Sequence, residues 1–168
     1  QQEKCDILMA GMSITPSRQK EIILLPYQGE ATQSYALIYW KRKPVAMRDL
    51  SGKTIAVMSG TWMEDYLKTE KNIIPKVLES NSELVMDIQY GKSDAAFVEP
   101  YIARDIITKH PEIRMIELPL PKSAWVLGNG IGIKKSNIKL AQEIQTALDN
   151  IKKSGLTLEL EKKWLHKK

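Results

Sequence analysis

The sequence predicts an α/β fold in which mostly parallel sheets are covered by helices. Short apolar runs of strand length alternate along the chain with segments of helical spacing, the arrangement typical of such sheets. The 168 residues are 43% apolar and 27% charged, which is enough to bury a core in one or two lobes. No apolar run approaches the about 20 residues of a membrane helix, so we expect no stable membrane insertion.

The first elements are short. Residues 5–9 and 22–25 are apolar runs that predict strands, and residues 16–21 between them predict a short helix. Residues 35–40 are an apolar run of strand length and predict another strand, and residues 49–52 predict a turn.

A capping box marks the next helix. Residues 54–58 predict a buried strand, after which Thr61 takes the N-cap position and Glu64 lies three residues later. The helix extends to about residue 68, and further strands and helices alternate beyond it. We expect strands at residues 76–78, 95–98, 113–116 and 130–133, and helices at residues 82–90 and 100–109.

The C-terminal part predicts two helices. Apolar residues recur at helical spacing in the first of them, and Gly155 is a natural stop after it. Its repeating residues are Leu140, Ala141, Ile144, Ala147, Leu148 and Ile151. Leu156, Leu160 and Trp164 mark the last helix.

The net charge of +5 raises the question of nucleic-acid binding, and its distribution argues against it. Residues 121–168 carry 10 basic and 4 acidic side chains, in lysine pairs that flank or punctuate amphipathic helices, where solvent exposure explains them. The single cysteine, Cys5, permits no internal disulfide and no zinc site, and we expect it in the core. We therefore expect no metal, no cofactor and no nucleic-acid partner.

Polar segments follow three of the predicted strands. The segment 11–18 follows the first strand, Ser59-Gly60-Thr61 follows the strand at residues 54–58, and Glu99 follows the strand at residues 95–98. Ligands of open α/β sheets bind at the carboxyl ends of the strands. A free amino acid needs a cationic fork for its carboxylate and an anion for its ammonium group, and Arg18 and Glu99 supply these two.

Four segments, in this order and at these separations, resemble a known family. They are Gly11-Met12-Ser13-Ile14-Thr15-Pro16-Ser17-Arg18, Ser59-Gly60-Thr61, Asp94-Ala95-Ala96-Phe97-Val98-Glu99 and Gly130-Ile131-Gly132-Ile133. The chain resembles over nearly its whole length the amino-acid receptors of ABC importers, the bacterial extracellular solute-binding proteins of family 3. Within that family, its 12–18 segment and its ending 158–164 are most similar to arginine-type receptors of chlamydia-like bacteria.

The resemblance implies roles for particular residues. Ala10, Gly11 and Ser13 would hold the ligand from one lobe, Arg18 would clamp its carboxylate and Glu99 would meet its ammonium group. Ser59, Thr61 and Trp62 would add contacts from the other lobe. In the family a basic residue often stands where this chain has Met58, and a small residue where it has Trp62, so the start of that helix is expected to differ.

The resemblance also implies the two-lobed type II periplasmic-binding-protein fold. Residues 1–28 and 127–168 would form lobe 1, lacking its N-terminal part, and residues 30–126 would form lobe 2. The uncovered apolar surface would favour dimers or strand exchange. The implied location is the periplasm or, through a lipid anchor, the cell surface, with any export signal outside this sequence. Residues 27–30 replace the usual run that enters the hinge.

Three functions are compatible with the resemblance. The first is a carrier, not an enzyme, that binds an amino acid between two lobes and passes it to the membrane subunits of an ABC permease. The second is a dehydratase-like enzyme of the same fold, which needs a general base, and Glu99 is the only evident acid. The third is a ligand-sensing module of a receptor or kinase. Structural roles also remain open: Arg18 as a surface charge, Thr61 and Glu99 as helix caps, and Trp62 as a core residue.

Overall fold

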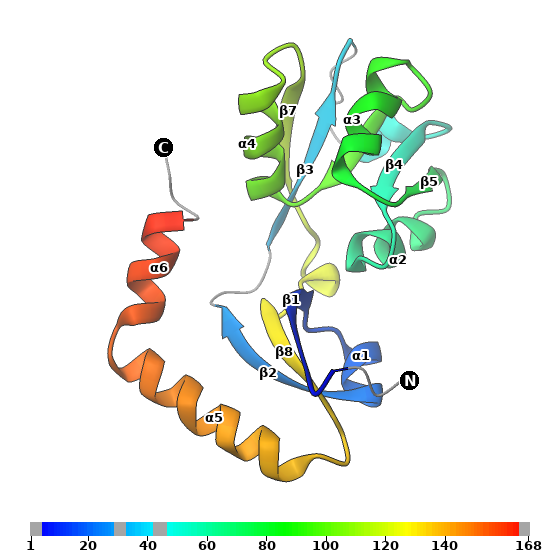
Figure 1. Ribbon diagram of the computed structural model, residues 1–168. Helices are drawn as coiled ribbons and strands as arrows, with labels where there is room; N and C mark the ends of the chain where they lie inside the picture. The colour runs from blue at the N-terminus through cyan, green and yellow to red at the C-terminus, as the bar shows by residue number, and fades with distance from the viewer. Residues whose placement is uncertain (1–4, 29–32, 42–46, 165–168) are drawn as a thin grey trace. The chain divides into compact units, whose positions relative to one another are not determined.

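The computed structural model describes residues 5–28, 33–41 and 47–164 of the chain. It divides into two compact units (Figure 1): residues 1–32 with 126–168, and residues 33–125. The hinge residues 29 and 30, and the terminal lysine pair 167–168, lie outside the described residues.

The first unit contains a three-stranded sheet. Its strands are β1 (Ile7–Ser13), β2 (Ile22–Gln28) and β8 (Asn129–Lys134), in the order β1-β8-β2. Both pairings are antiparallel, so the expectation of mostly parallel sheets is wrong for this unit. The short helix α1 (Pro16–Glu21) connects the two outer strands, which pair with the middle strand and not with each other.

Strand β1 differs from the strand expected at residues 5–9. It begins at Ile7 and continues through Gly11 to Ser13, because Gly11 adopts a φ of +64° within an irregular register and does not end the strand. Cys5 precedes the strand and is exposed, so its expected place in the core is wrong. The polar segment that begins at Gly11 therefore starts inside β1.

One face of this sheet is covered by the longest helix. Helix α5 (Ile138–Lys153) packs Ala141 and Leu148 against Ile131 and Ile133 of β8. Asn137 caps the helix by accepting a hydrogen bond from the amide of Leu140. Helix α6 (Leu156–Trp164) follows Gly155, which has a φ of +78°, as the sequence predicts.

The second unit is built on a five-stranded mixed sheet. Its strands are β3 (Ser34–Tyr39), β4 (Thr54–Met58), β5 (Ile74–Leu78), β6 (Ala95–Val98) and β7 (Arg114–Pro119). The order is β5-β4-β6-β3-β7. Strand β4 pairs in parallel with β5 and β6, whereas β3 is antiparallel to β6 and β7. The expectation of parallel pairing is thus right for three strands and wrong for β3 and β7.

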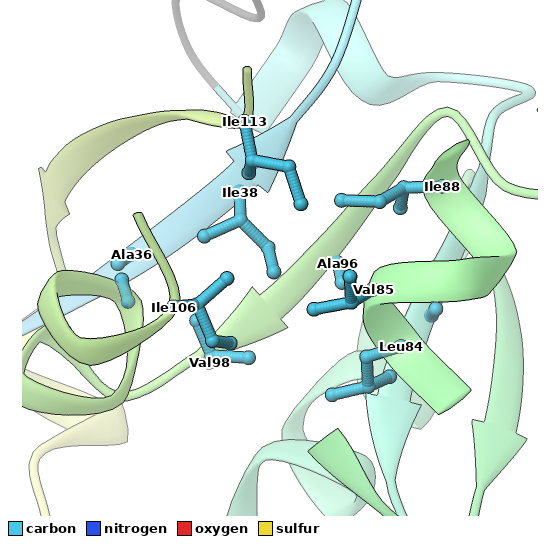
Figure 2. Packing of buried hydrophobic residues seen from close by; sticks show 11 residues of the cluster. Ala36, Ile38, Leu84, Val85, Ile88, Ala96, Val98, Ile106 and Ile113 are labelled. Atoms are coloured by element: carbon cyan, nitrogen blue, oxygen red, sulfur yellow. The ribbon is translucent and has the colours of Figure 1, made fainter. Parts of the chain in front are cut away.

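Helices cover both faces of this sheet. On one face, α3 (Asn81–Gln89) and α4 (Pro100–Lys109) close an aliphatic core, shown in Figure 2. Figure 2 labels Ile38 of β3, Val98 of β6, Leu84 of α3 and Ile106 of α4 in this core. Since side chains alternate along a strand, the neighbouring residues of the same strands face the other layer.

The other layer is aromatic and belongs to α2 (Trp62–Thr69). Tyr35 of β3 stacks on Phe97 of β6 with ring centroids 4.5 Å apart. Trp62 and Tyr66 of α2 lie 6.1 and 5.8 Å from the Phe97 ring. The start of α2 is therefore fixed to the strands by its aromatic residues.

Candidate functional site

Two of the predicted site segments leave neighbouring parallel strands of the second unit. Val57 of β4 lies opposite Phe97 of β6, so Ser59 and Glu99 follow the same edge of the sheet at equivalent positions. The amide of Ser59 donates to the carbonyl oxygen of Leu78 at the end of β5. The structure thus brings Ser59, Thr61 and Glu99 to one edge of one sheet, as predicted for a ligand site.

Residues 58–64 are joined by a network of internal hydrogen bonds, and we call this segment the 58–64 turn. The Thr61 hydroxyl donates to the carbonyl oxygen of Met58 at 2.8 Å and accepts from the amide of Glu64 at 3.3 Å. The Glu64 carboxylate accepts from the amide of Gly60 at 2.8 Å and pairs with Lys68 at 2.5 Å. Thr61 is therefore the N-cap that the sequence predicts.

Glu99 occupies the N-cap position of α4 without acting as a side-chain cap. Pro100 fills the first helical position, and the carbonyl oxygen of Glu99 accepts from the amide of Ala103. Its half-buried carboxylate makes no hydrogen bond or ion pair with the described residues. A carboxylate so placed is available to a cationic group.

The predicted residues of the first unit lie on β1 and α1. The guanidinium of Arg18 donates through Nη1 to the carbonyl oxygen of Ser13 at 2.9 Å, and Ser13 is buried. Thr15 caps α1 by accepting from the amide of Arg18. Ala10 and Gly11 lie within β1 and are exposed, so the expectation that they follow a strand end is wrong.

Trp62 is placed in the aromatic layer of the second unit. Its side chain is 5% exposed, and its Nε1 has no hydrogen-bond partner among the described residues. This placement fits the core role that the sequence left open. Contact of its ring with a ligand stays a prediction.

Two neighbouring groups have altered ionisation. The hydrogen bond from Lys68, with that from the amide of Gly60, lowers the pKa of Glu64 below its usual value. Burial, with a hydrogen bond to Glu70, raises the pKa of Tyr66 to about 12. The sequence interpretation missed this Tyr66–Glu70 pair, although residues four apart along a helix lie side by side and the spacing could have indicated it.

A polar cavity of about 410 Å³ lies elsewhere, in the first unit, lined by Cys5, Asp6, Lys134, Ser136 and Asn137. Within the described ranges, no group of three or more His, Cys, Asp or Glu side chains could hold a metal ion. In the same part of the chain, no helix combines the length and the apolar character needed to cross a membrane.

Comparison with known proteins gives a family match. The profile of the bacterial extracellular solute-binding proteins, family 3, matches residues 1–167. A probable ABC transporter arginine-binding protein, ArtJ of Chlamydia trachomatis serovar D, is 36% identical over 163 residues, which cover 97% of this chain and 63% of ArtJ. A putative ABC transporter arginine-binding protein 2 of Escherichia coli K12 is 26% identical and covers 98% of this chain and 68% of its own length.

Comparison with solved structures also finds a similar periplasmic binding protein. A periplasmic binding protein of Salmonella typhimurium, described as having high arginine specificity, superposes with a TM-score of 0.86 at 25% identity. The match covers 96% of this chain and 73% of the Salmonella chain. The chain thus spans less than two thirds of the length of the chlamydial relative and about three quarters of the Salmonella structure.

Proposed function

Since this chain belongs to the bacterial extracellular solute-binding proteins of family 3, we propose that it is a receptor that binds a free amino acid and delivers it to an ABC-type permease. In this role it returns its ligand unchanged and is not an enzyme. The periplasm is the proposed location, and the permease membrane subunits are the proposed partners.

One observation carries the proposal: the carboxylate of Glu99, which has no partner among the described residues, follows β6 at the position where Ser59 follows β4. An edge with an available anion beside the amides of a helix N-terminus can receive both charges of an amino acid. In this proposal Glu99 meets the ligand's ammonium group, and the 58–64 turn contributes donors to its carboxylate.

The first unit supports the same proposal through Arg18. Its guanidinium donates to the Ser13 carbonyl oxygen, which orients the side chain, and its planar fork has the geometry that suits a carboxylate. Ala10, Gly11 and Ser13 are the proposed further contacts from this unit. Backbone groups on β1 can provide them, because Ala10 and Gly11 are exposed.

Arginine is the proposed ligand, with other polar or basic amino acids as alternatives. The support is the repeated description of relatives as arginine-binding proteins, in Chlamydia trachomatis and Escherichia coli among others. The described residues do not select arginine by themselves, since the groups above address only the parts common to all amino acids.

Thermal unfolding in the presence of an amino-acid panel tests the proposal. A ligand at 100 times its dissociation constant stabilises the folded protein by about 2.7 kcal/mol. We expect arginine at millimolar concentration to raise the unfolding temperature, and the recovered arginine to be chemically unchanged. A folded protein that no amino acid stabilises, or that converts its ligand, contradicts the proposed function.

A further inference from the structure

Glu64 uses its carboxylate in an unusual way for a capping box. In that motif the glutamate at the third helical position bonds to the amide of the N-cap residue itself. Here it accepts from Gly60, the residue before the N-cap Thr61, at 2.8 Å. Gly60 has a φ of +69°, a conformation that other residues adopt at a cost.

The Thr61 hydroxyl is fully used inside the turn. Its single proton is donated to the carbonyl oxygen of Met58, and its oxygen accepts from the amide of Glu64. The hydroxyl therefore has no proton left for a ligand carboxylate, so any donor from Thr61 is its backbone amide.

The displaced bond of Glu64 leaves backbone amides open. Within the described residues, the amides of Thr61 and Trp62 have no hydrogen-bond partner in the turn. The first amides of a helix lack partners within the helix, and an anion is favoured there. These two amides are thus among the donors that the turn can offer to a carboxylate.

Lys68 holds Glu64 in this position. Its Nζ lies 2.5 Å from Oε1 of Glu64, whereas Oε2 bonds to Gly60, so the two carboxylate oxygens have separate partners. The Glu64 side chain is 15% exposed and that of Lys68 is 55% exposed. Lys68 thus neutralises an anion that would otherwise repel a bound carboxylate.

We propose that Glu64, held by Lys68, is a positioning residue for the ligand: it fixes Gly60 and thereby leaves the amides of Thr61 and Trp62 open to the ligand carboxylate. This inference rests on the proposed function. It makes the contribution of Thr61 a backbone contribution and adds two residues, Glu64 and Lys68, that touch no ligand themselves.

Affinity measurements on three variants test the proposal, with arginine as the probe. Glu64→Ala removes the bond to Gly60 and is expected to weaken arginine binding about tenfold, the scale of a lost helix-cap interaction. Glu64→Gln keeps an oxygen acceptor for Gly60 and is expected to restore most of the affinity. The arginine affinity of Lys68→Met is expected to lie between those of Glu64→Ala and Glu64→Gln.

The pair Asp105 and Lys109 on α4 provides a matched control. It has the same spacing and a distance of 2.6 Å, but it does not touch the turn. Asp105→Ala and Lys109→Met should leave arginine affinity unchanged. Equal losses in control and test variants, or a Glu64→Ala variant that binds as tightly as the wild type, overturn the proposal.

An NMR titration without ligand separates this inference from the proposed function. The Gly60 amide resonance should shift as Glu64 is protonated, at a pKa below the usual glutamate value, and this step should be absent in Glu64→Gln. If the Gly60 resonance follows the protonation of Glu64 but no amino acid binds the wild type, the proposed function is wrong, while the hydrogen bond between Glu64 and Gly60 is supported. A Gly60 resonance that does not respond to Glu64 refutes the positioning role, even where Glu64→Ala does not fold.

Discussion

Arg18 and Ser13 are joined by a hydrogen bond of 2.9 Å from a guanidinium nitrogen to a backbone carbonyl oxygen. The bond joins the Arg18 side chain, on α1, to the last residue of β1, five residues earlier in the chain. It leaves the planar group oriented, which lowers the entropy that ligand binding must overcome.

Arg18→Lys should weaken the binding of every amino-acid ligand by a similar factor. A lysine ammonium is a point charge without the planar fork, so it cannot hold Ser13 and a carboxylate in the same geometry. Calorimetry with arginine and with one neutral amino acid measures the effect. Unchanged affinity for both would show that Arg18 does not clamp the carboxylate.

Glu99→Gln should lower affinity by about 2–5 kcal/mol, because it removes the charge opposite the ligand ammonium while keeping the shape. The second unit should fold normally, since the Glu99 carboxylate takes no part in capping α4. Calorimetry combined with circular dichroism separates the two effects. Normal binding by Glu99→Gln would show that Glu99 does not contact the ligand. Loss of folding would show that its role is structural.

The stability of the protein should decline in alkaline solution through Tyr66. The pKa of its hydroxyl is raised to about 12 by burial and by the hydrogen bond to Glu70, against about 10 in an unfolded chain. The protonated hydroxyl is thus favoured in the folded state, and its stabilising contribution is complete below about pH 10 and is lost as the pH rises toward about 12.

Urea unfolding at neutral and at alkaline pH measures this effect. Tyr66→Phe should reduce the alkaline loss of stability, because phenylalanine does not ionise. Tyr90→Phe is the control, since Tyr90 is 76% exposed. Identical pH dependence in Tyr66→Phe and wild type would show that Tyr66 does not contribute.

Lys76→Met should destabilise the second unit by about 1–3 kcal/mol. Asp87 of α3 is 6% exposed and pairs with Lys76 of β5 at 2.5 Å, so the substitution leaves a buried carboxylate without its cation. Lys53→Met is the control, because its partner Asp94 is 40% exposed, and breaking a pair with a solvated carboxylate costs little. Urea unfolding in which both variants lose the same stability would contradict this reading.

Association through β1 is the last prediction. β1 is an outer strand, and its residues Ile7, Leu8 and Met9 are exposed. An uncharged apolar edge favours pairing with another chain, so we expect dimers or strand exchange in light scattering. Leu8→Lys should shift the protein toward monomer, and a wild-type chain that stays monomeric at high concentration would contradict the prediction.

Elements with strong local signals could be predicted from the sequence. The ranges 16–21, 54–58, 95–98 and 100–109 agree with α1, β4, β6 and α4. Pro100 at the first position of α4 and Thr61 at the cap of α2 explain why, since their effects depend only on neighbouring residues.

Strand pairing could not be predicted in the same way. The alternation of strands and helices suggested parallel sheets, but β8 returns from the far end of the sequence to lie between β1 and β2. Such pairing depends on contacts between distant residues, which periodicity does not report. Gly11 misled for a related reason: a glycine can end a strand or form an irregularity within it.

The sequence predicted where the candidate site lies on the sheet better than it predicted the hydrogen bonds within the site. The edge shared by Ser59 and Glu99 followed from where their strands end. The bond of Glu64 to Gly60 could not be read from the sequence, which predicted only that Glu64 belongs to a capping box. Choosing between two adjacent amides depends on backbone angles that are set when the turn folds.

The order β1-β8-β2 has a consequence for the order in which the chain folds. The second unit is one continuous segment, so all its strands are present in residues 33–125. The sheet of the first unit lacks its middle strand until residues 129–134 appear, and β1 and β2 have no partner in that sheet before then. When the chain becomes free to fold from its N-terminal end, the first unit therefore completes its folding last, and its apolar outer strands stay open to chaperones until β8 joins them.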